Sequence, residues 1–143
     1  MFRRILVGFD GSRDAHHALR AGITLAAAAQ GEVVVVIVVS ASHGETDEDR
    51  RHAFEAEAAP LRAAVENELR RTDAATGVHV TAGDRPAQTL SAYAEERGFD
   101  LLVVGRHGRE RASHGGLGRM ARELAEKASC PLLLVGDGDP DGD

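Results

Sequence analysis

The chain has 143 residues, a formal net charge of −6 and a hydrophobic fraction of 43%, which predicts a single acidic globular domain with a sizeable apolar core. This acidic balance argues against general binding to nucleic acid, because that function needs a basic face. One cysteine, Cys130, allows no disulfide framework, and no stretch has the apolar length of a signal peptide or a membrane span, so we expect a cytoplasmic protein that does not bind a membrane.

The first predicted element is a strand over 5–9, an apolar run that ends in the polar turn Asp10-Gly11-Ser12. A helix is predicted over 13–30, because apolar residues repeat there at helical spacing. Ser12 is suited to cap this helix. Asp10 at the end of a central strand costs free energy to desolvate unless a partner is present, and it also suits an Asx turn with Gly11. The sequence leaves open whether Asp10 and Ser12 serve the turn or a ligand.

The middle of the chain continues the alternation of strand and helix. Residues 32–39 contain the longest β-branched run, which is typical of a strand buried on both faces. A helix is predicted over 46–72, and Pro60 inside it indicates either a kink or a restart. A short strand over 78–81 and a helix over 86–97 follow. Alternation of this kind predicts an α/β fold with a doubly wound parallel sheet.

The most informative stretch begins with a predicted strand over 101–105 and continues to a helix over 118–128 and a strand over 131–135. The first of these strands leads into a loop that contains five glycines: Gly105, Gly108, Gly115, Gly116 and Gly118. Glycine lets backbone N–H groups approach an anion at a helix N-terminus. This loop and the first turn of the helix that follows it carry one acid, Glu110, and five arginines: Arg106, Arg109, Arg111, Arg119 and Arg122. In an acidic chain, this local positive charge indicates an anion-binding site.

The glycine spacing is Gly105-x2-Gly108-x9-Gly118, followed by a helix, a Cys-Pro pair and a strand. This pattern resembles the ATP-binding signature of the universal stress protein family, in which serine or threonine follows the last glycine. Arg119 occupies that hydroxyl position here. The resemblance covers residues 3–135 and implies a single doubly wound five-stranded parallel sheet with strand order 3-2-1-4-5, a Rossmann-like fold of the adenine nucleotide alpha hydrolase type.

In that strand order the first and fourth strands are neighbours, and the winding of the chain reverses between them. Ligands bind at such a switch point, beyond the carboxyl ends of the strands. The resemblance therefore implies an adenine nucleotide, ATP with Mg²⁺ carried by its phosphates, at the two loops that follow these strands. By the resemblance, Asp10 and Val38 would contact the nucleoside, and the backbone from Gly105 to Gly108 and around Gly118 would contact the phosphates. The full set of implied contact residues is Asp10, Gly11, Ser12, Val38, Gly105, Arg106, His107, Gly108, Arg109, Gly118, Arg119 and Met120.

Several roles stay open at the level of sequence. Arg119 either clamps a phosphate through a charge-assisted hydrogen bond or fills the space that the phosphates need. His107 and His114 either donate to a phosphate or are merely exposed. The seven histidines show no spacing typical of a metal-ligand set. Cys130 is expected to pack as a small hydrophobic residue.

The resemblance implies an ATP-binding protein of the stress response, and no general base is evident, so we expect a binding protein rather than an enzyme. The alternatives are a dimeric interaction module of the same family that binds no nucleotide, and a slow ATP-hydrolysing enzyme. A homodimer through 131–135 is expected, since a bare edge strand favours self-complementary pairing. The domain is predicted over 1–135, with residues 136–143 as an acidic disordered tail.

Overall fold

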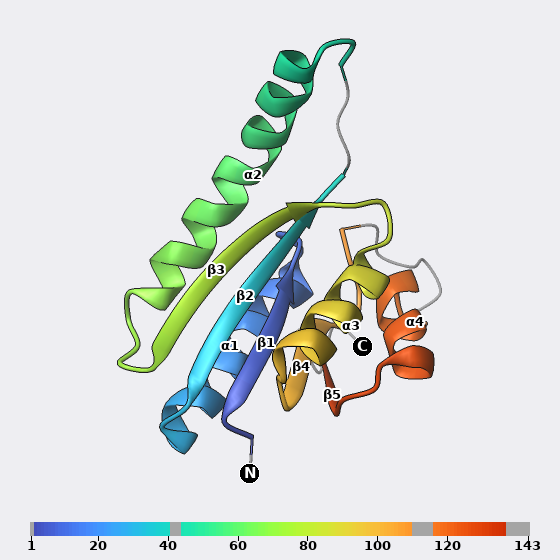
Figure 1. Cartoon of the computed structure of the whole chain (residues 1–143). Coiled ribbons are helices and arrows are strands. Elements are labelled where there is room, and N and C mark those ends of the chain that lie inside the picture. Colours follow the sequence, from blue (N-terminus) through green and yellow to red (C-terminus); the bar gives the residue numbers. More distant parts are fainter. Residues whose placement is uncertain (1, 41–43, 110–115, 137–143) are drawn as a thin grey trace.

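The computed structural model describes residues 2–40, 44–109 and 116–136, and its elements alternate between strand and helix (Figure 1). In chain order these elements are β1 (Arg4–Phe9), α1 (Arg13–Ala29), β2 (Glu32–Val39), α2 (Asp47–Leu69), β3 (Ala75–Ala82), α3 (Pro86–Arg97), β4 (Leu101–Gly105), α4 (Arg119–Lys127) and β5 (Leu132–Val135). Every predicted element is present. The predicted acidic tail, 136–143, lies outside the described residues except for Gly136.

The five strands form one sheet in the order β3-β2-β1-β4-β5, and every neighbouring pair is parallel. The central strand β1 pairs with β2 from Arg4↔Glu32 to Phe9↔Ile37 and with β4 from Ile5↔Leu101 to Val7↔Val103. The doubly wound sheet and the strand order implied by the family resemblance are therefore confirmed. The switch point lies between β1 and β4.

Two elements differ from the expectation in extent or continuity. The third strand spans Ala75–Ala82, longer than the predicted 78–81, because it pairs with β2 along its whole length. Its first residues carry no apolar run, so the pairing with β2 defines the strand more than its own side chains do. The helix α2 runs from Asp47 to Leu69 as one helix with Pro60 inside it, and it does not restart at the proline.

The sheet has an aliphatic core on each face, because successive strand residues point to opposite sides. On the face that α1 and α2 cover, the buried strand residues include Ile5, Val7 and Val35. On the face that α3 and α4 cover, they include Leu6 and Leu102. With helices packed on both faces, the carboxyl ends of β1 and β4 lie side by side at the same end of the sheet.

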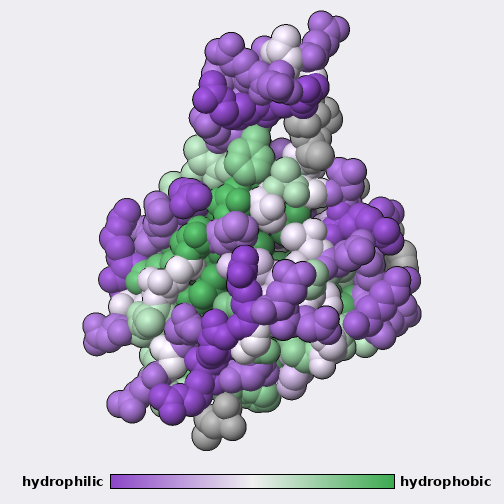
Figure 2. All heavy atoms as spheres, viewed as in Figure 1, coloured by the Kyte–Doolittle hydropathy of each residue, from purple (hydrophilic) through white to green (hydrophobic). Residues whose placement is uncertain are grey.

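None of the four described helices covers one part of the second face. In Figure 1, α3 and α4 lie in front of the β1, β4 and β5 side of the sheet, whereas the front of β3 is open. Figure 2 shows apolar surface in this region. Two β2 side chains that pack on this side, Val34 and Val38, are only partly buried.

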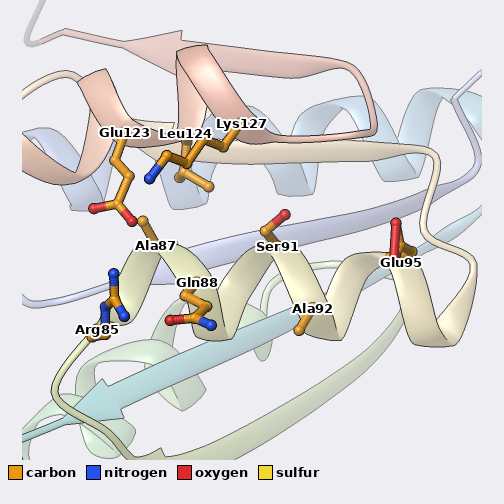
Figure 3. A pocket seen from close by; sticks show the side chains of 9 residues that line it. All are labelled: Arg85, Ala87, Gln88, Ser91, Ala92, Glu95, Glu123, Leu124 and Lys127. Atoms are coloured by element: carbon orange, nitrogen blue, oxygen red, sulfur yellow. The ribbon is translucent and has the colours of Figure 1, made fainter.

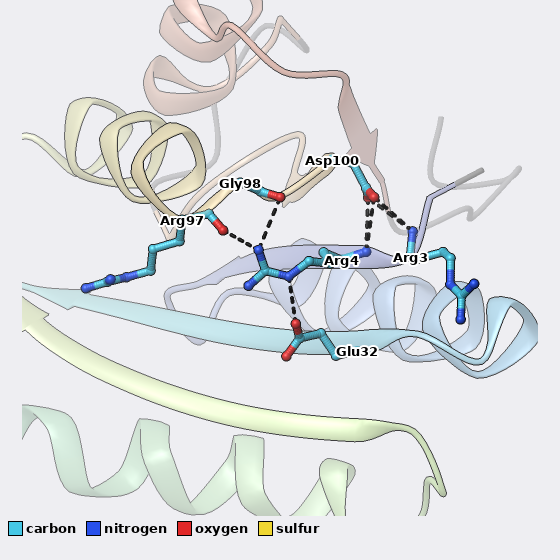
Figure 4. Close-up of polar contacts among 6 residues, drawn as sticks. All are labelled: Arg3, Arg4, Glu32, Arg97, Gly98 and Asp100. Carbon is cyan, nitrogen blue, oxygen red and sulfur yellow. Dashed lines mark hydrogen bonds and ion pairs between the residues drawn. The ribbon is translucent and has the colours of Figure 1, made fainter.

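The amino ends of the strands are held together by a polar cluster (Figure 4). The Asp100 carboxylate accepts hydrogen bonds from the backbone N–H groups of Arg3 and Arg4, at 3.1–3.3 Å. The Arg4 side chain pairs with Glu32 at 2.7 Å and donates to the carbonyl oxygens of Arg97 and Gly98. This cluster joins β1, β2 and β4 at the edge opposite the switch point, so it fixes the sheet without occupying the carboxyl ends.

Candidate functional site

The loops that follow β1 and β4 lie against each other at the carboxyl edge of the sheet. Nε of Arg109 donates to the Asp10 carbonyl oxygen at 2.8 Å. A Cβ placed on Gly108 would lie 3.1 Å from Oδ2 of Asp10. The structure therefore brings together two groups of residues that the sequence analysis identified separately.

The loop after β1 is a tight turn that opens α1. Oδ1 of Asp10 accepts from the Ser12 backbone N–H at 2.9 Å, which closes an Asx turn around Gly11, whose φ is +84°. Oγ of Ser12 accepts from the Ala15 backbone N–H at 3.2 Å and caps the helix. A Cβ on Gly11 would lie 2.7 Å from Leu61 of α2. Asp10 and Ser12 thus have structural roles in the turn, and Oδ2 of Asp10 faces Gly108.

The motif glycines at the ends of the second loop are needed for close packing. A Cβ on Gly105 would lie 2.8 Å from Cβ of Asp14, at the first turn of α1. A Cβ on Gly118 would lie 3.2 Å from both the Arg106 carbonyl oxygen and the His107 Cα. The Gly118 N–H donates to that same Arg106 oxygen at 2.8 Å. These close approaches pack the start of the loop against α1 and bring the two ends of the loop into contact with each other.

Among the residues that the structure describes, no side chain caps the N-terminus of α4. Gly118 is its N-cap residue, whereas Ser12 caps α1 and Thr46 caps α2 through their side chains. The first N–H groups of a helix have no partner within the helix, so an uncapped N-terminus is suited to bind an anion. Arg119 lies exposed in the first turn of α4, and Arg106 is exposed at the other end of the loop.

Met120, also among the predicted site residues, is partly buried and packs against the apolar core under α3 and α4. Its side chain therefore serves the core. Its backbone N–H remains one of the first-turn groups at the N-terminus of α4.

His107 is neither exposed nor free to donate from its ring to a phosphate. Its Nδ1 lies 2.9 Å from Oδ2 of Asp14, and its Nε2 lies 2.8 Å from the Gly116 carbonyl oxygen. The His107 backbone N–H also donates to Oδ2 of Asp14, at 3.1 Å. The ring is therefore part of the loop's internal structure. The predicted His114, like Arg111, lies outside the described residues.

Asp14 is the residue that the sequence analysis missed. Its side chain is 1% exposed, although it belongs to the first turn of a surface helix. A signal was present: Asp14 precedes Ala18 by four residues and Gly22 by eight, so it lies on the buried stripe of α1. An acid on such a stripe indicates a buried partner.

Val38 lies where β2 extends beyond β1. The pairing of β1 with β2 ends at Phe9↔Ile37, while the Val39 carbonyl oxygen accepts from the Gly83 N–H on the β3 side. Adjacent residues in a parallel strand direct their backbone groups to opposite neighbours. The Val38 carbonyl therefore points towards the β1 side, past the last pair of the two strands.

A concave feature lies away from these loops, between α3 and α4. It is a groove of about 340 Å³ lined by Arg85, Ala87, Gln88, Ser91, Ala92, Glu95, Glu123, Leu124 and Lys127 (Figure 3). None of the predicted site residues lines it. Within residues 2–40, 44–109 and 116–136, no group of three or more His, Cys, Asp or Glu side chains could hold a metal ion, and no helix is long and apolar enough to cross a membrane.

Comparison with known proteins identifies one family. A sequence model of the universal stress protein family matches residues 1–136. A universal stress protein of Thermus aquaticus, encoded in the QAH/OAS sulfhydrylase 3′ region, is 32% identical over 140 residues, which cover 94% of this chain and 99% of that protein. The universal stress protein YxiE of Bacillus subtilis (strain 168) is 28% identical over 149 residues, with the same coverage of 94% and 99%.

Solved structures give the same fold. Universal stress protein UspA of Lactobacillus plantarum superposes with a TM-score of 0.83 at 24% identity, covering 94% of this chain and 97% of that one. A universal stress protein in complex with cAMP has a TM-score of 0.75 at 19% identity, with coverage of 94% and 97%. The universal stress protein from Archaeoglobus fulgidus in complex with dAMP has a TM-score of 0.70 at 23% identity, with coverage of 94% and 98%.

Proposed function

Because the chain belongs to the universal stress protein family, we propose that it is an adenine-nucleotide-binding protein of the stress response, with ATP as its ligand. One observation carries the proposal: the loops after β1 and β4 meet at the switch point of the sheet, where Asp10 lies beside Gly108. Two structures of the same fold are complexes with adenine nucleotides, cAMP and dAMP. They support this class of ligand.

Each part of the nucleotide would meet a different part of the site. The Val38 carbonyl would accept from the adenine amino group, and Oδ2 of Asp10, the oxygen not used in the Asx turn, would accept from a ribose hydroxyl. The phosphates would lie at the uncapped N-terminus of α4, where backbone N–H groups and the guanidinium of Arg119 can donate. Arg109 is anchored at the Asp10 carbonyl by Nε and would use its other guanidinium nitrogens.

Mg²⁺ would arrive with the phosphates. The described residues contain no carboxylate cluster that could bind it alone. Mg²⁺ usually keeps several waters and binds phosphate oxygens with few protein ligands, so the residues present fit a nucleotide-borne ion. The cytoplasmic location expected from the sequence is part of this proposal.

The proposal is tested by ligand-dependent thermal unfolding. A ligand at about one hundred times its Kd adds roughly 2.7 kcal/mol to the free energy of unfolding, so MgATP in that excess should raise the melting temperature measurably. Gly108→Val should abolish the rise, because its Cβ would lie 3.1 Å from Oδ2 of Asp10 and its side chain would occupy the space between the two loops.

Gly77→Val is the matched control for this experiment. A Cβ at Gly77, on the edge strand β3, would lie 3.5 Å from Val34, an ordinary contact distance. This variant should keep the response to MgATP. If ATP, ADP and AMP all leave the wild-type melting temperature unchanged, nucleotide binding is refuted and the interaction module takes its place.

A homodimer through β5 is the second part of the proposal. β5 is the last strand of the sheet, and Leu133 on it is 36% exposed, one of three exposed large hydrophobic residues in the described chain. An exposed edge strand offers unpaired backbone groups, and the same strand of a second copy can pair with it around a two-fold axis. This feature also favours the interaction module, which would use the same edge without a nucleotide.

A further inference from the structure

The base of the glycine loop contains a buried polar contact that nucleotide binding alone does not explain. Asp14 and His107 are 93 residues apart in the chain, and their side chains are 1% and 9% exposed. Oδ2 of Asp14 accepts a hydrogen bond from the His107 backbone N–H and lies 2.9 Å from the ring Nδ1. Among the described residues, Oδ1 of Asp14 has no hydrogen-bond partner. A carboxylate this deeply buried requires a compensating positive charge.

The hydrogen-bonding chemistry of the ring supplies that charge. The Asp14 carboxylate and the Gly116 carbonyl are both acceptors, and neither can donate to a ring nitrogen. Both contacts of the imidazole are therefore hydrogen bonds only when Nδ1 and Nε2 each carry a proton, which makes the ring a cation. The neutral ring has one N–H and would lose one of the two contacts.

The two contacts of His107 act on the two ends of the loop. Nδ1 fixes the first end to α1, and Nε2 fixes the second end at Gly116. The Gly118 N–H, which donates to the Arg106 carbonyl, closes the same base. The position of Gly116 and Gly118 sets where α4 begins. Protonation of His107 therefore affects the position of the residues just before α4, where the proposed anion site lies.

We propose that Asp14 and His107 are positioning residues, a charged latch that holds the two described ends of the glycine loop, at His107 and at Gly116, together only while the imidazole is protonated. Neither side chain touches the ligand. The inference rests on the proposed function, because the site that the latch positions is the nucleotide site. Its consequence is that nucleotide affinity decreases as the pH rises and the ring loses a proton.

Other charged groups lie on the elements that carry or adjoin the latch, and their effects must be separated from that of His107. They are Arg13 on α1, Asp10 on the first loop, Arg106 and Arg109 on the glycine loop, and Arg119 and Arg122 on α4. The arginines keep their charge at every pH of the experiment. The carboxylates of Asp10 and Asp14 and the nucleotide phosphates titrate in both the wild type and His107→Gln. The difference between the two pH profiles therefore reports the imidazole alone.

The first test uses the full-length protein without nucleotide. Nitrogen-15 NMR of the histidine rings at about pH 7 distinguishes protonated from unprotonated nitrogens. In the wild type, both ring nitrogens of His107 should be protonated. In Asp14→Asn, which keeps the size and one acceptor, one of them should be unprotonated. A wild-type ring with one unprotonated nitrogen overturns the latch.

The second test is calorimetric titration with MgATP from about pH 6 to about pH 9, the range around which histidine changes charge. Wild-type affinity should fall about tenfold across this range, which corresponds to 1.4 kcal/mol. His107→Gln keeps one donor for Gly116 and has no charge to lose, so its affinity should be weak and follow only the pH trend of the nucleotide itself. His52→Gln, exposed on α2, is the control and should keep the wild-type profile.

The two tests separate failure of the latch from failure of the proposed function. If the wild type binds MgATP and His107→Gln shows the same pH profile, the latch is refuted and nucleotide binding stands. If the wild type binds no adenine nucleotide, the proposed function is refuted, and the ring spectra still decide whether the charged pair exists.

Discussion

Arg119 is the residue at which the chain departs from its family's motif, and its replacement gives the sharpest test of the site. Arg119 is exposed in the first turn of α4. A cation there faces the positive end of the helix macrodipole, which costs about 0.3–1 kcal/mol. We predict that Arg119→Ser slightly raises the free energy of unfolding of the ligand-free protein and weakens its binding of ATP.

The size of the binding loss follows from the type of hydrogen bond. A hydrogen bond to a charged group contributes about 1.5–3 kcal/mol and a neutral one about 0.5–1.5 kcal/mol. Because Arg119 is exposed, solvent screens it and the lower end of the difference applies. About 1 kcal/mol corresponds to roughly fivefold weaker ATP binding. AMP has one phosphate close to the nucleoside, so its affinity should change by less than about twofold on the same scale.

Calorimetric titration of the wild type and of Arg119→Ser with ATP and AMP, at low and high salt, measures these differences. The salt dependence of ATP binding should decrease in Arg119→Ser, because one exposed charge has been removed. Arg71→Ser, an exposed arginine just after α2, is the control and should leave both affinities unchanged. Tighter ATP binding by Arg119→Ser would refute the clamp and show that the arginine fills space needed by the phosphates.

Three further predictions concern the rest of the molecule. Leu133→Lys places a charge on the exposed edge of β5 and should shift the species seen by light scattering from dimer to monomer; a wild type that is monomeric at micromolar concentration would contradict the interface. Gly22→Ala should lower the free energy of unfolding in urea by about 1–3 kcal/mol, because its Cβ would lie 2.5 Å from Cγ2 of Val7, whereas Gly77→Ala should cost less. Burial raises the pKa of the Cys130 thiol, a backbone hydrogen bond lowers it, and Asp100 adds a smaller rise. The rate of Cys130 alkylation should therefore begin to rise at a higher pH in the folded protein than in the urea-unfolded chain. Coincident pH profiles of the two rates would contradict this shift.

The sequence predicts those elements of the fold that depend on a local pattern of residues. The apolar runs of β1, β2 and β4 indicate buried strands, and the glycines after β4 indicate a loop before α4. The start of β3 was missed because Ala75, Thr76 and Gly77 have no strand pattern of their own and become a strand by pairing with β2.

The site was predicted less completely, for a related reason. His107 read as a loop histidine that could donate to a phosphate, because its partner Asp14 lies 93 residues earlier in the chain. Only the meeting of β4 with α1 shows that the ring is buried. The proposed contact of Val38 with the nucleotide would use a backbone carbonyl, which has no side-chain signature, so it was available only from the family resemblance. Contacts that depend on the tertiary fold are therefore the ones that sequence alone leaves open.

The junction of β1 with β4 also has a consequence for synthesis of the protein. β1 first pairs with β4 at Ile5↔Leu101, so the central pair of the sheet joins residues almost one hundred positions apart. At about 5–20 residues per second on the ribosome, β1 waits roughly 5–20 s for β4 to emerge. The segment from β1 to β3 can associate in that interval, but the two loops at the switch point cannot. Any ligand of this site can therefore stabilise only chains whose synthesis is nearly finished, and it has no part in the early steps of folding.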